Sequence, residues 1–149
     1  LAVEQITQDI PGYHFELGKG CTLRDGNDVT IVATGYMVAQ ALKAADALAQ
    51  EGISARVIDI HTIKPLDEEL LLKAARETGA IVTAEEHNII GGLGSAVAEV
   101  LVENYPVPME RVGVRDTFGH SGEPAALVEH YHLTPADIAA AAKKAMSRK

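Results

Sequence analysis

The chain has 149 residues, the length of one ordinary domain, and a fold of this size buries roughly 68 to 70% of the surface that the unfolded chain exposes. A formal net charge of −8 and an aromatic content of 4% argue against nucleic acid as a partner, because phosphates would be repelled and bases would find few rings to stack on. The single cysteine, Cys21, cannot form an internal disulfide and no apolar run approaches the ~20 residues that span a bilayer, so we expect a cytoplasmic protein without a membrane partner.

The N-terminal segment, residues 1–14, carries polar residues, Pro11 and Gly12 without a clear period. It lacks the basic flank and the long apolar core of a signal peptide, and it begins without methionine. We expect a linker from a missing upstream domain, followed by one domain over residues 15–149.

From residue 21 onward, apolar strands alternate with amphipathic helices. The turn signal Asp25-Gly26 on its own suggests a hairpin, and a buried strand follows over residues 29–34. The next helix, over residues 37–52, ends with Gly52 at its C-terminal cap position. Its predicted apolar stripe consists of Val38, Ala41, Leu42, Ala45, Leu48 and Ala49.

The same alternation continues to the C-terminus. Strands are predicted at residues 55–60, 80–85 and 109–115, and helices at residues 67–79 and from the glycine turn to about Tyr105. After residues 123–131, a last helix begins at a capping-box-like start formed by Thr134, Pro135 and Asp137. Crossovers of this length predict a mostly parallel sheet with helices on both faces, a three-layer α/β/α fold.

Loops at the carboxyl ends of parallel strands meet along one edge, where open α/β folds usually bind ligands. Three loops qualify: residues 34–36, 61–64 and 85–94. The third loop contains a G-x-G pattern at Gly92 and Gly94. However, Val97 stands where a dinucleotide-binding fingerprint needs a small residue, and two acidic residues precede the turn. A Walker loop is also absent from the sequence. The glycines are therefore expected to turn the chain sharply and to bring the following helix close to the sheet.

Glu85, Glu86 and His87 raise the alternative of a metal or acid/base cluster. Adjacent strand residues point to opposite faces, so the two glutamates do not automatically converge. No second histidine or carboxylate follows at ligand spacing, and no serine lies in a nucleophile elbow. We predict no catalytic, cofactor-binding or metal-binding residue in this chain.

Four segments, in order and spacing, resemble the C-terminal domain of the transketolase family of thiamine-diphosphate enzymes. They are ATG at residues 33–35, VIDIHTIKPLD at 57–67, TAEEH with GGLGSAVAEVL at 83–101, and DTFGHSGEPAALVEHYHLTPADI at 116–138. The resemblance covers residues 15–146. It implies a mostly parallel five-stranded sheet of order 1-3-2-4-5 with the first strand antiparallel.

The resemblance also implies a function for the complete enzyme, which transfers a two-carbon ketol unit between sugar phosphates. Thiamine diphosphate and Mg²⁺ (or Ca²⁺) would be held by upstream diphosphate- and pyrimidine-binding domains, and the complete enzyme would be a homodimer. The family's metal motif, G-D-G followed by paired asparagines, is missing here, and RDGNDV at residues 24–29 is only a turn. The chain would support assembly without chemistry of its own.

Two alternatives stay open. One is the equivalent domain of a deoxyxylulose-phosphate synthase or of a 2-oxoacid dehydrogenase E1 β subunit. The other is a stand-alone module that binds an anion or a nucleotide at the strand ends.

The loop over residues 85–94 is the predicted contact surface, with an apolar centre and a polar rim. A competing hypothesis places its two isoleucines in the core. The interface candidates are Glu85, Glu86, His87, Ile89, Ile90, Gly91, Gly92 and Gly94.

Overall fold

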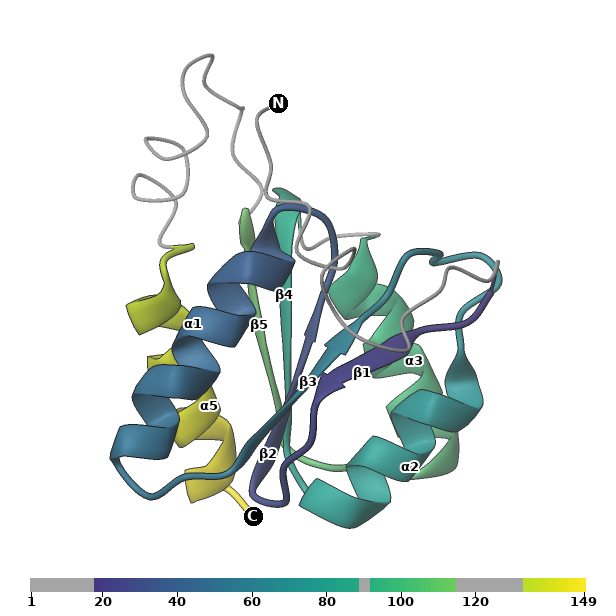
Figure 1. Ribbon diagram of the computed structural model, residues 1–149. Coiled ribbons are helices and arrows are strands. Elements are labelled where there is room, and N and C mark those ends of the chain that lie inside the picture. Colours follow the sequence, from purple (N-terminus) through teal and green to yellow (C-terminus); the bar gives the residue numbers. More distant parts are fainter. Residues whose placement is uncertain (1–17, 89–91, 115–132) are drawn as a thin grey trace.

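The computed structural model describes residues 18–88, 92–114 and 133–149, without the side chains of residues 87 and 88. In this part a five-stranded sheet lies between two layers of helices (Figure 1). The strands are β1 (Cys21–Arg24), β2 (Val29–Ala33), β3 (Ala55–Asp59), β4 (Ile81–Asn88) and β5 (Met109–Val114). The helices are α1 (Met37–Gln50), α2 (Glu68–Thr78), α3 (Leu93–Asn104) and α5 (Pro135–Ser147). The predicted linker and residues 123–131 lie outside the described residues.

The strand order is β1-β3-β2-β4-β5, with β1 antiparallel to β3 and the other neighbours parallel. This confirms the order and the antiparallel strand that the resemblance implies. The hairpin suggested by Asp25-Gly26 is wrong, because β1 pairs with β3 through Cys21 and Asp59, and β3 separates β1 from β2.

The connection from β1 to β2 passes against the start of β3. A Cβ at Gly26 would lie 2.3 Å from the carbonyl carbon of Ala55, so only glycine fits this approach. The buried Arg56 holds the connection, since its Nε donates to the Gly26 carbonyl at 3.1 Å and its guanidinium pairs with Glu77 at 2.8 Å. A turn signal marks where a chain bends, whereas these contacts decide which strand it meets next.

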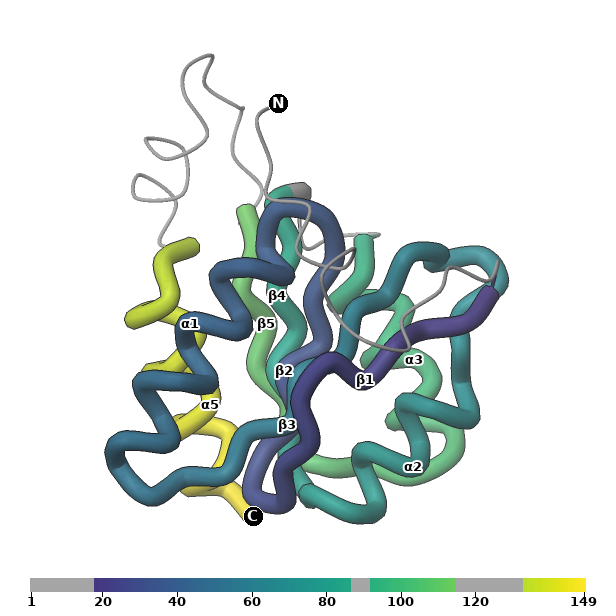
Figure 2. The backbone as a smooth tube through the Cα atoms, viewed as in Figure 1, coloured from purple at the N-terminus to yellow at the C-terminus, as the bar shows by residue number. Residues whose placement is uncertain are grey.

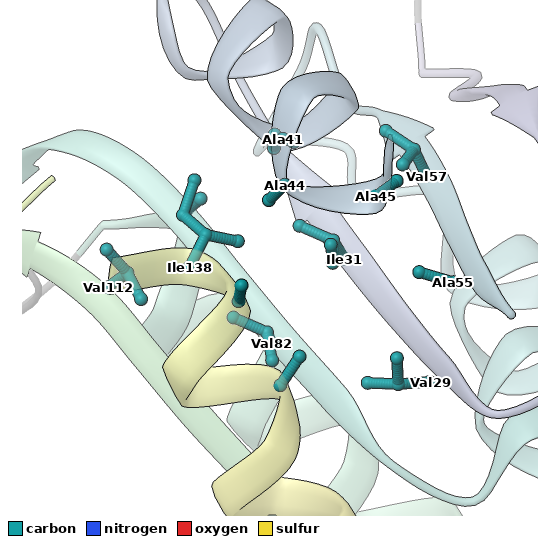
Figure 3. Packing of buried hydrophobic residues seen from close by; sticks show 14 of the residues in the cluster. Val29, Ile31, Ala41, Ala44, Ala45, Ala55, Val57, Val82, Val112 and Ile138 are labelled. Carbon is teal, nitrogen blue, oxygen red and sulfur yellow. The ribbon is translucent and has the colours of Figure 1, made fainter. Parts of the chain in front are cut away.

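The sheet separates two hydrophobic cores, and helices lie on both of its faces (Figure 2). Helices α1 and α5 cover one face of the sheet, and α2 and α3 cover the other. Every residue of β2 and β3 is buried, because alternate side chains enter opposite cores. Figure 3 shows Ile31, Val57 and Val82 pointing toward the helices α1 and α5.

Helix boundaries follow the predicted capping residues closely. The capping box of Thr134 and Asp137 is present at α5, and Gly79 ends α2 with a left-handed φ of 75°. Gly52 follows the C-cap of α1 directly, with a φ of 79°. The predicted stripe of α1 is wrong at Ala49, which is exposed, because the buried side of the helix runs through Ala41, Ala44, Ala45 and Leu48. Among the described helices, none has the length and apolar content needed to cross a membrane.

Candidate functional site

The carboxyl ends of β2, β3 and β4 lie at one edge of the sheet, as predicted, because these strands run parallel (Figure 1). The loops that follow these strands therefore share this edge, which we call the carboxyl edge. Among the described residues it comprises 34–36 after β2, 60–67 after β3, 85–88 at the end of β4, and 92 before α3.

The carboxylate of Glu85 is bonded to backbone amides of the same chain. Its side chain is only 1% exposed, and its two carboxylate oxygens accept hydrogen bonds from the amides of Leu93 at 2.9 Å and Gly94 at 2.7 Å. These amides belong to the first turn of α3, where the helix dipole favours a negative charge. Glu85 thus ties the end of β4 to the start of α3 and closes the base of the loop between them.

Gly94 allows α3 to lie directly on the sheet, as predicted for the glycine turn. A Cβ at this position would be 2.9 Å from Cδ of Arg111 and 3.1 Å from Oγ1 of Thr83. The reason is close packing and not an unusual backbone angle, since Gly94 lies within α3 and Gly92 has a φ of −97°. The Thr83 hydroxyl beneath Gly94 has no hydrogen-bond partner in the described part of the chain.

Glu86 differs from Glu85 in its burial and in its contacts. It is half-buried, and its Oε1 would be 3.0 Å from a Cβ at Gly35, so the carboxylate lies over the turn that follows β2. Within the described residues its side chain forms no hydrogen bond or ion pair. Strand geometry gave no reason to expect the two glutamates to converge, and they contact different segments: Glu85 the start of α3, and Glu86 the turn after β2. The side chain of His87 and residues Ile89, Ile90 and Gly91 are outside the described residues.

Asp59 and His61 form a pair that sequence analysis missed. Asp59 ends β3 with a side chain 6% exposed, and its Oδ2 lies 3.6 Å from Nδ1 of His61. Burial raises the pKa of the Asp59 carboxyl, and the nearby His61 partly opposes this shift. Burial, and secondarily the charge of Asp59, raise the pKa of the Cys21 thiol on β1. An acidic residue inside the apolar run VIDI was the available signal.

Asp67 links the start of the described chain to this edge. One carboxylate oxygen accepts from the Gly20 amide at 2.9 Å, while the other accepts from the Leu70 amide at 3.4 Å and caps α2. The Gly18 amide donates to Thr62 at 3.5 Å. The loop after β3 therefore holds the segment that enters β1.

The described residues contain no group of three or more histidine, cysteine or acidic side chains able to hold a metal ion. Three acids of the edge already serve the fold: Glu85 caps α3, Asp67 caps α2, and Asp59 pairs with His61. The part of this edge that remains for contact with another protein is the surface of its loops.

Comparison with known proteins identifies this arrangement. A family model described as "Transketolase, C-terminal domain" matches residues 18–138, which include every described strand, the helices α1, α2 and α3, and the first turn of α5. The chain belongs to the transketolase family. It carries the C-terminal domain of that family, as the four sequence segments implied.

Two relatives place the domain within the transketolase family. A protein of Clostridium sp. (strain MSTE9), named 6-deoxy-6-sulfo-D-fructose transketolase subunit SqwH, is 56% identical over 135 residues, which cover 91% of this chain and 42% of the relative. A 1-deoxy-D-xylulose-5-phosphate synthase of Heliobacterium modesticaldum is 47% identical over 129 residues, which cover 86% of this chain and 20% of the relative. The chain thus spans less than half the length of these transketolase-family proteins.

A solved transketolase-family structure has the same fold. It is titled "Split gene transketolase, inactive beta4 tetramer", is 58% identical, and superposes with a TM-score of 0.88. The match covers 93% of this chain and 46% of that chain. The three-layer fold with a mostly parallel five-stranded sheet is therefore the transketolase C-terminal fold, as predicted.

Proposed function

We propose that this domain is the C-terminal assembly domain of a thiamine-diphosphate-dependent transketolase, a transferase that moves a two-carbon ketol unit between sugar phosphates. The observation that carries the proposal is the family match over residues 18–138 in a chain that spans only 42% of its sulfofructose transketolase relative. A domain of this extent serves the enzyme by holding its other parts together.

Among the described residues, the candidates for holding the family's cofactor are already engaged within the fold. The Asp25-Gly26 step is the nearest match to the metal motif, but Gly26 is pressed against the backbone of β3 and Asp25 lies 3.3 Å from Arg56. Glu85, the deepest acid of the carboxyl edge, is occupied by two helix amides. Thiamine diphosphate and Mg²⁺ (or Ca²⁺) belong to the diphosphate- and pyrimidine-binding domains of the complete enzyme in this proposal.

The partners of the domain are those two upstream domains or the subunit that carries them, and a second copy within a homodimer. A solved relative carries "beta4 tetramer" in its title, which supports self-association of subunits that contain this domain. Two features suit the carboxyl edge to such contacts: its loops are short, and Glu85 and Asp67 fix their ends.

Reconstitution tests the proposal. The chain is mixed with the diphosphate- and pyrimidine-binding part of the enzyme, and ketol transfer is followed in the presence of thiamine diphosphate and Mg²⁺. We expect transfer only in the mixture, with neither ketol transfer nor cofactor binding by this chain alone. Stoichiometric binding of the cofactor to the isolated chain at about micromolar concentration, measured by calorimetry, would contradict the proposal.

A second candidate is the equivalent domain of a deoxyxylulose-phosphate synthase, favoured by the 47% identity to the Heliobacterium synthase. The two activities differ in their product. Formation of 1-deoxy-D-xylulose 5-phosphate by the reconstituted enzyme would support the synthase, and transfer of a ketol unit from a ketose phosphate to an aldose phosphate would support the transketolase.

A further inference from the structure

A pocket of about 300 Å³ lies between α2 and β1, the outermost strand on one side of the sheet (Figure 1). We call it the β1–α2 pocket, and its volume is at the lower end of the range for small-ligand sites. Leu70, Lys73 and Glu77 contribute from α2, where their spacing of three and four residues places them on one face of the helix. Arg56 contributes from β3. The residues that line the pocket are all described, and none of them belongs to the carboxyl edge.

Arg56 is a buried cation that the fold holds in place. Its side chain is 8% exposed, so more than nine-tenths of it is buried. The Nε atom donates to the Gly26 carbonyl at 3.1 Å, and Nη1 lies 2.8 Å from a carboxylate oxygen of Glu77. A guanidinium has five N–H donors, so these two contacts leave it able to bind a further acceptor. Arg56 is therefore positioned before any ligand arrives, which lowers the cost of binding.

The remaining contact of Arg56 in the described chain is with a carboxylate that faces solvent. Asp25 lies 3.3 Å from Nε of Arg56, and the Asp25 side chain is 87% exposed. An ion pair with an exposed partner contributes little, because water screens it and the side chain loses rotational freedom when it is held. An anion that forms stronger hydrogen bonds can therefore take the place of Asp25 at Arg56.

Lys73 supplies a charge that the described fold does not use. Of the five charged side chains that line the pocket, it alone forms no hydrogen bond or ion pair in the described part of the chain. Glu77 is one turn further along α2, at the spacing at which a lysine and a glutamate can pair, but its carboxylate contacts Arg56. The whole chain carries a net charge of −8, so an uncompensated cation in the same pocket as a buried one favours an anionic ligand locally.

The lining of the pocket fits a phosphate ester with hydroxyl groups. A guanidinium fork and a lysine ammonium both bind phosphate oxygens. A phosphate monoester carries about −1.5 to −2 charges at pH 7, which matches two cations better than a carboxylate does. Thr22 and Glu77 offer oxygen acceptors for hydroxyl groups, and Leu70 offers an apolar contact. None of the lining residues is aromatic, so a nucleotide base would find no ring to stack on.

We propose that the β1–α2 pocket binds a small phosphate ester, with the phosphate held by Arg56 and Lys73 in place of Asp25. The hydroxyl groups of the ester contact Thr22 and Glu77. The inference is independent of the proposed function, because neither the carboxyl edge nor ketol transfer enters it.

Titration of the 149-residue chain, labelled with nitrogen-15 and followed by the NMR shifts of its amides, tests the site. The probes are glycerol 3-phosphate, inorganic phosphate and glycerol. We expect saturable shifts at the amides of Thr22, Arg56 and Lys73 with glycerol 3-phosphate, with a dissociation constant of about 1 mM or below. Inorganic phosphate should bind more weakly, because it lacks the hydroxyl contacts, and glycerol should not bind.

Removal of the free cation should weaken binding. Lys73→Gln should raise the dissociation constant by about tenfold or more, since it removes a charge-assisted contact to the phosphate. Lys64→Gln is the matched control, because Lys64 is also exposed but does not line the pocket. Each of these substitutions changes the net charge from −8 to −9, so a difference between them is not an effect of overall charge.

Removal of the competing carboxylate should have the opposite effect. Asp25→Asn should tighten binding by about twofold to fivefold, because the ligand no longer displaces a charged partner of Arg56. Glu99→Gln is the control, since Glu99 is exposed on α3, outside the pocket, and both substitutions change the net charge from −8 to −7. Thermal melting of every variant checks that the fold is intact.

Three results would overturn the inference: equal affinities of Lys73→Gln and Lys64→Gln, equal affinities of Asp25→Asn and Glu99→Gln, or shifts at the pocket amides that do not saturate. Equal binding of inorganic phosphate and glycerol 3-phosphate would overturn the assignment to an ester and indicate a site for the free anion. None of these results depends on ketol transfer by the reconstituted enzyme, so failure of this site and failure of the proposed function are distinguishable.

Discussion

The clamp between Glu85 and α3 offers a quantitative test of how the carboxyl edge is held. Glu85→Gln keeps the size of the side chain but replaces one acceptor oxygen with an NH₂ group, which then faces the amide of Leu93 or Gly94. One of the two bonds, at 2.9 and 2.7 Å, is lost at a site only 1% exposed. A hydrogen bond to a charged group contributes about 1.5 to 3 kcal/mol, and a buried amide left without a partner costs a similar amount.

We therefore expect Glu85→Gln to lower the free energy of unfolding by about 2 to 3 kcal/mol. With a urea dependence of about 2 kcal/mol per molar, the denaturation midpoint falls by roughly 1 M. Glu86→Gln is the control on the adjacent residue, which forms no bond in the described part of the chain and should change stability by about 0.5 kcal/mol or less. Equal midpoints for the two variants would refute the assignment of Glu85 as the clamp.

Two further predictions concern packing and pH. Gly94→Val should destabilise the fold by about 1 to 3 kcal/mol, because the valine side chain would meet Thr83 and Arg111. Ala96→Val on the same helix is the control and should have a smaller effect. Equal melting temperatures for the two variants would contradict this prediction. Asp59→Asn should stabilise the protein at pH 7. Because the pKa of Asp59 is raised in the folded state, ionisation of its carboxyl group opposes folding. The free energy of unfolding of the wild type therefore falls as pH rises from about 4, the unfolded pKa, through the folded pKa. The gain should shrink as pH is lowered toward 4 in urea titrations, and a gain that is absent at pH 7 would show that the ion pair with His61 outweighs burial.

The elements of the fold could be predicted because their signals are local. Thr134 and Asp137 cap a helix three residues apart, and Gly79 ends α2 within the same turn. Continuous apolar runs such as residues 29–33 indicated buried parallel strands. The pairing of β1 could not be derived in this way, because it depends on contacts between Gly26 and the distant Ala55 and Arg56.

The sequence could predict where the site lies but not the contacts of its individual charged residues. Parallel strands fix where the loops gather, and alternation along β4 separates Glu85 from Glu86. Glu85 bonds to an amide eight residues further along the chain, so no short sequence motif predicts that it caps α3. The pair of Asp59 and His61 became evident only once burial and ion pairs were known. Sequence patterns report periodicity, whereas the state of a charge depends on neighbours brought in by the fold.

The central claim, that this domain serves assembly and not chemistry, is tested most directly by the concentration dependence of ketol transfer in the reconstituted enzyme that carries Glu86→Lys. We predict that the variant needs a higher protein concentration to reach half of its maximal rate, because the rim charge of the contact is reversed, and that the maximal rate per assembled enzyme equals that of the wild type. A maximal rate that stays low at saturating protein, with assembly intact by sedimentation, would contradict the claim and place the carboxyl edge in the reaction itself.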